Sequence, residues 1–349
     1  MLPGHDFLLD PGIIFLNHGS YGACSRPVFK RYQEWQRELE VRPVEFLGRR
    51  FDDLVEEALA PLAAYVGAAA EDLVFVPNTT AGLNAVIRSL PLQPGDEVLT
   101  TTEEYGALVK TWEFVGARLR AVPPDELAGA VTEKTRVVFC SHITSPTARL
   151  VDVEAAVGAA RSVGALAIVD GAHAPGHVEL DLEALDADIY AGNCHKWLCA
   201  PKGSAFLWAR PEHQRWIAPL VVSWGFGADA SFHERHGWQG TRDPAALLTV
   251  PAAIEYAQWV DLERAHAVAQ RGRKALPPFR LPSAPRMWAT ELAPGDPKGL
   301  QRRLFDEHRI EVPVFDWEGH RLLRVSIGPY NDEGDLDALA AALATEGAC

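Results

Sequence analysis

Short apolar segments alternate with longer amphipathic segments between residues 73 and 209, and this alternation constrains the fold more than any other feature. Such a pattern is typical of β-strands joined by helical crossovers, which place the strands parallel and cover both faces of the sheet. We therefore predict an α/β fold with a seven-stranded, mainly parallel sheet. Strands are expected at 73–76, 97–102, 118–122, 136–141, 166–170, 188–191 and 204–209, and helices at 81–90, 107–117, 124–131 and 153–163.

The segments on either side of this block follow other patterns. Residues 28–40 and 51–65 have helical periodicity, whereas residues 211–240 are rich in Trp, His and Gly and indicate a long loop. A helix is expected at 244–269, bent near Asp261. After a Pro-rich joint at 276–285, a β-α-β-β-α pattern predicts a small α+β domain, with elements at 287–292, 297–308, 311–315, 322–327 and 335–345.

Composition narrows the classes of partner and compartment. The net charge of −14 argues against a nucleic-acid or anionic-membrane partner, because both attract basic surfaces. The five cysteines form no CxxC pair, so neither a zinc site nor a disulfide framework is expected. The first residues lack the pattern of a signal peptide, and no apolar run approaches 18 residues. We expect a cytoplasmic protein.

Lys196 and Asp170 are the first candidates for chemistry. Asp170 ends a predicted strand, and ligands of parallel sheets gather at the carboxyl ends of strands. Lys196 follows Asn193, Cys194 and His195 and precedes Trp197, an apolar and aromatic setting that favours a neutral amine able to form a Schiff base. An aspartate that keeps a pyridine nitrogen protonated completes a pyridoxal phosphate (PLP) site. Taken alone, either residue also fits a surface lysine or a turn-capping aspartate.

Two further segments join a predicted strand to a predicted helix. Thr79, Thr80 and Ala81 open a helix, where hydroxyl and backbone N–H groups bind phosphate well, although an ordinary N-cap explains the same residues. Tyr105 lies after the next strand and could stack on a pyridine ring or simply pack in its loop.

Three more side chains extend this candidate site. His173 could hydrogen-bond Asp170 or the cofactor, and His195 could reach the phosphate, although a lone histidine is more often a packing residue. Strand alternation places Arg324 on the face opposite Leu323 and Val325. Its guanidinium could bind a substrate carboxylate with two hydrogen bonds or form a surface ion pair.

The combination of motifs resembles the class V aminotransferases, which are PLP enzymes of fold type I, and within them the isopenicillin N epimerase-like branch. The resemblance extends over nearly the whole chain. It is carried by residues 15–22, 78–84, 104–106, 141–147, 170–173, 192–203 and 238–244, and by Arg324-Val325-Ser326 with Tyr330-Asn331.

The resemblance implies a role for each matching residue. Lys196 would link covalently to PLP, Asp170 would pair with its ring nitrogen, and Tyr105 would stack on the ring. The remaining contacts would come from Thr79, Thr80, Ala81 and His195 at the phosphate, His173 and Ser145 near the ring hydroxyl, Arg324 and Asn17 at the substrate carboxylate, and Gly240 and Thr241 at the phosphate of the partner in a homodimer.

The resemblance also implies a division of the chain. Residues 1–20 would form an N-terminal segment that lines the site, residues 21–258 the large PLP-binding domain and residues 259–349 the small C-terminal domain.

The sequence argues against one type of PLP reaction and leaves several others open. Cysteine desulfurases need a nucleophilic cysteine before the carboxylate-binding arginine, and residues 308–324 contain none. Epimerisation at Cα of an amino-acid substrate is the main prediction, with Lys196 as one base and Tyr105 or a water as the second. A C–S lyase or an aminotransferase would share the first proton abstraction. A non-catalytic PLP-fold binding protein would have no need to retain Lys196, Asp170 and Arg324 together.

Overall fold

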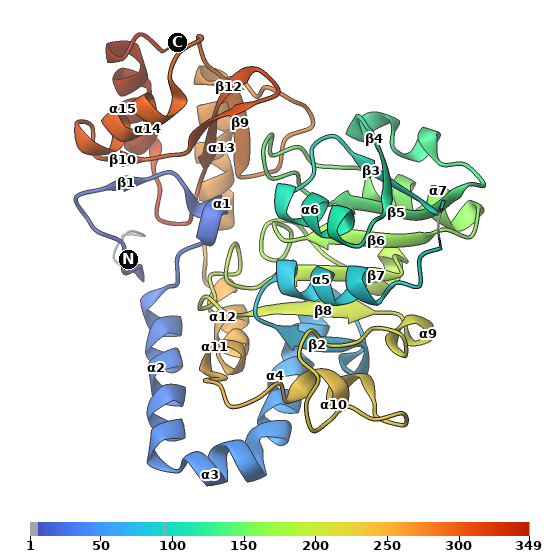
Figure 1. The fold of residues 1–349 in the computed structure, drawn as a ribbon. Coiled ribbons are helices and arrows are strands. Elements are labelled where there is room, and N and C mark those ends of the chain that lie inside the picture. Colours follow the sequence, from blue (N-terminus) through green and yellow to red (C-terminus); the bar gives the residue numbers. More distant parts are fainter. Residues whose placement is uncertain (1–5, 94, 349) are drawn as a thin grey trace.

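The computed structural model describes residues 6–93 and 95–348 and contains a seven-stranded sheet in the order β2-β8-β7-β6-β5-β3-β4 (Figure 1). The pairs from β4 to β7 are parallel, and β8 lies antiparallel to both β7 and β2. The prediction of a seven-stranded, mainly parallel sheet is therefore confirmed. The strands are β2 (Leu73–Val76), β3 (Glu97–Thr101), β4 (Arg118–Val122), β5 (Thr135–Ser141), β6 (Leu166–Gly171), β7 (Ile189–Asn193) and β8 (Ala205–Ala209).

Helices cover both faces of this sheet because its strands are apolar on both sides. In β2, Leu73 and Phe75 belong to the core shared with α4 (Phe51–Val66) and α7 (Val153–Ser162), whereas Val74 and Val76 belong to the core shared with α5 (Thr79–Ser89) and α6 (Gly106–Phe114). Each buried side chain of this size contributes about 1.5–3 kcal/mol. Figure 1 shows α5 and α6 in front of the sheet.

The order of the strands creates a crevice between β3 and β5. From β3 the chain continues to β4 on one side, whereas from β5 it continues to β6 and β7 on the other side. The connections therefore diverge at the carboxyl ends of β3 and β5, which is where ligands bind in open α/β sheets. Tyr105 follows β3, and Ser141 ends β5.

The C-terminal part forms a second core around a three-stranded antiparallel sheet, in the order β11-β12-β9. Leu16 of the N-terminal segment joins this core, and β1 (Ile14–Phe15) pairs in parallel with β10 (Ile310–Glu311). The predicted domain limits themselves stay predictions. The other elements are β9 (Met287–Glu291), β11 (Val314–Trp317), β12 (His320–Ser326), α13 (Leu262–Ala275), α14 (Pro297–Asp306) and α15 (Glu333–Thr345).

Two predicted helices are shorter or more broken than expected. The segment 124–131 forms only two 3₁₀ turns, Pro124–Glu126 and Ala128–Ala130. The helix at 244–269 is replaced by α11 (Ala245–Leu248), α12 (Val250–Ala257) and α13. The break before α13 has a local cause, because the Asp261 carboxylate accepts the Arg264 N–H and starts a new helix.

A predicted loop and a predicted strand also differ from the structure. The loop at 211–240 contains α9 (Pro211–Gln214) and α10 (Phe232–Gly237), and a Ser231–Glu234 capping box begins α10. The strand expected at 311–315 is divided at Pro313, which lacks the N–H that a continuous ladder needs. The remaining elements are α1 (His18–Tyr21), α2 (Arg26–Val41), α3 (Pro43–Glu45), a π-helix (Phe46–Arg50), a 3₁₀ turn (Ala70–Asp72) and α8 (Leu182–Leu185).

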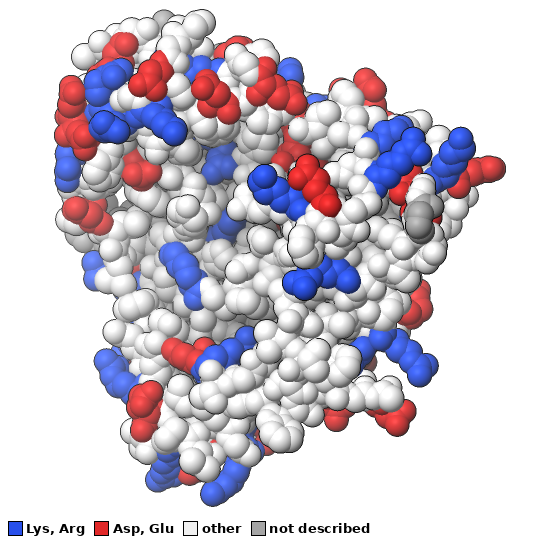
Figure 2. Space-filling view, in the orientation of Figure 1, with Lys and Arg blue, Asp and Glu red and all other residues white. Residues whose placement is uncertain are grey.

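Acidic and basic side chains are interspersed on the face shown in Figure 2, and much of its centre is uncharged. Within the described part of the chain, no helix combines the length and the apolar character needed to span a membrane.

Candidate active site

A cavity of about 520 Å³ lies at the crevice between β3 and β5 and collects most of the predicted site residues. The N-terminal segment, the large sheet and β12 all contribute to its walls. Its lining includes Tyr105, Thr79, Thr80, Ser145, Asp170, His173, His195, Lys196 and Arg324 from the predicted set, together with Gly19, Ser20, Tyr21, Asn78, Ser141, Ile143, Ala172 and Asn193.

Lys196 lies in the connection between β7 and β8 and is partly buried at the wall of the cavity. Its Nζ is 3.2 Å from His173 Nε2. Burial lowers the pKa of Lys196 to about 8, and Arg324 acts in the same direction, whereas Asp170 opposes them. The amine therefore loses its proton far more easily than an ordinary lysine, as Schiff-base chemistry requires.

Close backbone approaches hold the lysine connection in place. A Cβ on Gly22, whose φ is +67°, would lie 2.1 Å from the His195 carbonyl oxygen, and a Cβ on Gly176, at φ +78°, would lie 2.5 Å from the Trp197 backbone. His18 adds a hydrogen bond of 3.1 Å from Nε2 to the Lys196 carbonyl. Side chains at the two glycine positions would displace Lys196.

Asp170 ends β6 beside Ser141 of β5, and its Oδ1 accepts the Ala172 N–H at 2.9 Å. Burial raises the pKa of Asp170 to about 6, although Ala172 and Lys196 both favour its ionised form. A cationic ring nitrogen beside this buried carboxylate would favour ionisation further.

The N-terminus of α5 forms another part of the wall. The Asn78 side chain accepts the Ala81 N–H at 2.8 Å, and Asn193 Oδ1 accepts the Thr79 N–H at 3.0 Å. Ala81 is therefore held by the helix cap and is not among the lining residues. The Thr79 hydroxyl is buried without a partner among the described residues, which makes it a vacant donor at a helix N-terminus.

His195 also lines this region of the cavity. Its Nδ1 donates to the Ser204 carbonyl at 3.1 Å, which leaves Nε2 as the ring atom available to a ligand. Burial lowers the pKa of His195 to about 4, so the ring is neutral near pH 7.

Arg324 is a buried cation from β12 that forms no ion pair within the described residues. Its Nη1 donates to the Ser145 carbonyl and hydroxyl, and its Nη2 donates to Ser20 Oγ at 3.1 Å. The Ser20 hydroxyl in turn donates to Asn17 Oδ1, so Asn17 lies one layer behind the cavity. Burial lowers the pKa of Arg324 to about 10, and a carboxylate ligand would relieve this cost.

Glu104 lies behind the cavity wall against Ser141, and our sequence analysis gave it no role. This fully buried carboxylate accepts hydrogen bonds from the Thr101 hydroxyl and from both the hydroxyl and the N–H of Ser141. Burial raises the pKa of Glu104 to about 7. The available sequence signal was the pair Glu103-Glu104 directly after a buried strand.

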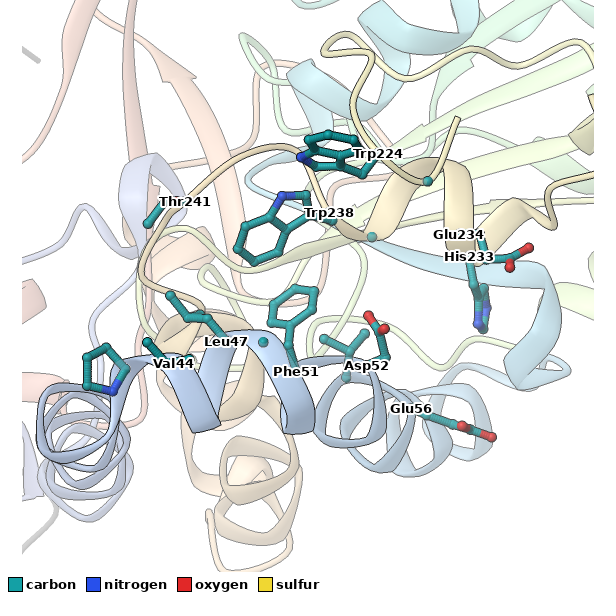
Figure 3. A pocket seen from close by; sticks show the side chains of 15 residues that line it. Val44, Leu47, Phe51, Asp52, Glu56, Trp224, His233, Glu234, Trp238 and Thr241 are labelled. Atoms are coloured by element: carbon teal, nitrogen blue, oxygen red, sulfur yellow. The ribbon is translucent and has the colours of Figure 1, made fainter. Parts of the chain in front are cut away.

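Gly240 and Thr241 do not line this cavity. Thr241 instead borders a second, more apolar cavity of about 880 Å³ between the π-helix region and α10, where Val44, Phe51, Trp224 and Trp238 lie around a shallow groove (Figure 3). Their predicted contact, with the phosphate of a partner chain, stays a prediction.

The residues present fit PLP. The cavity combines a partly buried lysine that deprotonates easily, a buried aspartate beside it, and a helix N-terminus with an unpartnered threonine hydroxyl. Together with the αβα layers, these features define a PLP-dependent enzyme of fold type I.

Comparison with known proteins specifies the family. The model of the family described as "aminotransferase class-V" matches residues 24–278. The chain belongs to this family, within its isopenicillin N epimerase-like branch. It is 37% identical to isopenicillin N epimerase from Amycolatopsis lactamdurans, over 96% of this chain and 95% of that protein. The enzyme of the same name from Streptomyces clavuligerus is 33% identical over the same shares.

A solved structure supports the fold. The apo cysteine desulfurase from Thermococcus onnurineus NA1 superposes with a TM-score of 0.84 at 20% identity, covering 98% of this chain and 96% of that one. The predicted fold type is therefore confirmed, and membership of the class V aminotransferase family confirms the predicted PLP dependence.

Proposed function

We propose that this enzyme epimerises the Cα of an amino acid or of an amino-acid group within a larger substrate. The observation that carries the proposal is the similarity, over nearly the entire chain, to two isopenicillin N epimerases. PLP supplies the electron sink that acidifies the Cα–H bond when it is bound.

In this proposal, Lys196 anchors the cofactor and moves the Cα proton on one side of the substrate. The pKa of its amine, lowered to about 8, suits proton transfer near neutral pH. Asp170, near the end of β6, keeps the ring nitrogen protonated. Its burial excludes water that would weaken this charge pair.

The remaining polar residues of the cavity bind the two anionic groups. Thr79, Thr80, the start of α5 and His195 hold the phosphate, and Ser145 and His173 lie near the ring hydroxyl. Arg324 binds the substrate carboxylate, and Asn17 orients the Arg324 guanidinium through Ser20. The absence of an ion pair on Arg324 among the described residues supports this assignment.

Tyr105 is the proposed stacking residue and the second proton-transfer group. It lies at the N-cap of α6, lines the cavity and is 45% exposed, so its hydroxyl has access to solvent protons. Replacement by Phe keeps the ring but removes the hydroxyl. We expect Tyr105→Phe to slow epimerisation at least tenfold while Cα–H exchange of one enantiomer continues, since only one of the two proton transfers is lost.

The proposed assembly is a homodimer in which Gly240 and Thr241 reach the partner's phosphate. The second cavity beside Thr241 presents a strongly exposed Trp224, at 93%, and an exposed Val44, at 73%, next to Trp238 (Figure 3). A second copy of the chain would cover this apolar surface, as protein interfaces commonly do.

The proposed compartment is the reducing cytoplasm. The four cysteines in the described part of the chain are free thiols, and three of them are buried.

Burial raises the pKa of Cys199 to about 12, and no cysteine lines the active-site cavity among the described residues. Neither observation favours a persulfide mechanism.

The decisive experiment is incubation in D₂O, with isopenicillin N and a panel of L- and D-amino acids and cysteine conjugates as substrates. Deuterium at Cα together with the opposite configuration, and without keto acid or ammonia, is the expected result. Pyruvate with a released thiol would instead identify a C–S lyase, and stoichiometric keto acid an aminotransferase. The Lys196→Ala variant should lose both the exchange and the visible absorbance of the bound cofactor.

A further inference from the structure

Trp197 begins a hydrogen-bond chain that ends at the Lys196 amine. Its indole Nε1 lies 3.2 Å from His173 Nδ1, and His173 Nε2 lies 3.2 Å from Lys196 Nζ. Trp197 and His173 are both buried, so water does not compete for these bonds.

The chemistry of the indole fixes the direction of this chain. An indole N–H is only a donor, so His173 Nδ1 must offer a lone pair. A neutral imidazole then carries its proton on Nε2 and donates it to Lys196 Nζ. Only an uncharged amine has a lone pair to accept that proton.

The surroundings hold the indole in one orientation. The His177 ring stacks on Trp197 with ring centroids 3.8 Å apart and planes inclined by 25°, and the Arg286 guanidinium lies 4.9 Å from the ring centroid. The tautomer of His177 is also determined. Its Nε2 accepts the Arg286 backbone N–H at 2.9 Å, so its Nδ1 donates to the His173 carbonyl at 3.2 Å.

We propose that Trp197 is a positioning residue that keeps the Lys196 amine uncharged by holding His173 in the Nε2–H tautomer. The inference rests on the assignment of Lys196 as the cofactor lysine, and it applies to any reaction that this lysine performs. Trp197 is not among the residues that line the cavity, and its N–H reaches the amine through His173.

Two charged groups also act on the protonation of Lys196, in opposite directions. Asp170 from β6 favours the ammonium form, whereas Arg324 from β12 disfavours it. His195 precedes the lysine, and its Nδ1–H donates to the Ser204 carbonyl instead of to Lys196 Nζ. Burial holds the pKa of His173 well below its ordinary range, which is consistent with a neutral ring.

The test replaces Trp197 by Phe, which keeps an aromatic ring against His177 and Arg286 but removes the N–H. The full-length chain is freed of cofactor with a carbonyl reagent, and the acetylation of Lys196 by trace acetic anhydride is followed by mass spectrometry against pH. At pH 7 we expect the rate to fall roughly three- to tenfold, because without the indole N–H His173 is no longer held in the tautomer that donates to the neutral amine.

Trp112→Phe is the matched control. Trp112 is equally buried, but its N–H has no partner among the described residues. Its replacement should leave the acetylation profile of Lys196 unchanged. In a His173→Gln background, Trp197→Phe should have no further effect, and an equal effect in both backgrounds would overturn the proposal.

The tautomer of His173 is measured directly in the wild-type chain by ¹⁵N-histidine NMR, with the signals assigned by their loss in His173→Gln. We expect an unprotonated Nδ1 and a protonated Nε2. A protonated Nδ1 would overturn the proposal even if Trp197→Phe does not fold. If Lys196→Ala retained the absorbance of bound cofactor, the assignment of Lys196 would fail, whereas the tautomer measurement tests Trp197 separately.

Discussion

At the scale of single residues, burial sets the ionisation of the acids in the site. The pKa of Glu104 rises from an ordinary 4.5 to about 7. Between these pH values the folded state holds a proton that the unfolded state has lost, so the free energy of unfolding falls as the pH rises from about 4.5 to about 7.

Glu104→Gln should remove this part of the pH dependence. An amide keeps partners for Thr101 and Ser141 but does not titrate, so we expect the variant to exceed the wild type at pH 8 by roughly 2–3 kcal/mol. Urea unfolding of the cofactor-free proteins at pH 5 and pH 8 measures this difference. The exposed Glu113 supplies the control, because Glu113→Gln should follow the wild-type curve.

Arg324→Lys tests the carboxylate site at the same scale. Lysine cannot reproduce the planar pair of donors, so we expect the KM for amino-acid substrates to rise about 10- to 100-fold while the cofactor absorbance stays unchanged. Arg321 on the same strand binds the Ala293 and Asp296 carbonyl oxygens instead. Arg321→Lys should leave KM unaltered, and an unaltered KM in Arg324→Lys would remove Arg324 from the site.

At the scale of elements, the N-terminus of α5 connects helix capping with phosphate binding. Asn78 caps the helix by accepting the Ala81 N–H. Asn78→Ala should lower the free energy of unfolding by about 1 kcal/mol. Asn78→Asp retains the cap but adds a negative charge, so it should preserve stability and weaken PLP binding about tenfold or more.

Urea denaturation and titration with PLP separate these two effects of Asn78. The proposal that α5 holds the phosphate is contradicted if Asn78→Asp binds PLP as tightly as the wild type.

At the scale of the whole molecule, the proposed dimer shares its active sites. Provided that the Thr241→Arg homodimer is inactive, a heterodimer of Lys196→Ala and Thr241→Arg chains, purified through two different tags, has one intact site if Thr241 acts on the partner and none if Thr241 acts within its own chain. We therefore expect about half of the wild-type activity per dimer. A heterodimer of Lys196→Ala and Asp170→Ala chains should stay inactive, and inactivity of the first heterodimer would place Thr241 in the site of its own chain and contradict the shared site.

Much of the site was predictable from local patterns. The strand-helix alternation determined the parallel sheet, because apolar strands buried on both faces need helices on both faces. The same topology brings Tyr105, Asp170 and Lys196 to one edge. Strand alternation also separated Arg324 from Leu323 and Val325, which lie in the C-terminal core.

The tertiary structure decided the ionisation and the tautomers of the site residues, which local patterns could not predict. The sequence by itself predicted the candidate residues and the strand ends at which they lie. Their ionisation and tautomers depend on long-range neighbours: burial against β5 raises the pKa of Glu104, and the proton on His173 is placed by Trp197, 24 residues away. Desolvation and hydrogen-bond direction arise only when distant segments enclose a group, so they appear only in the folded chain.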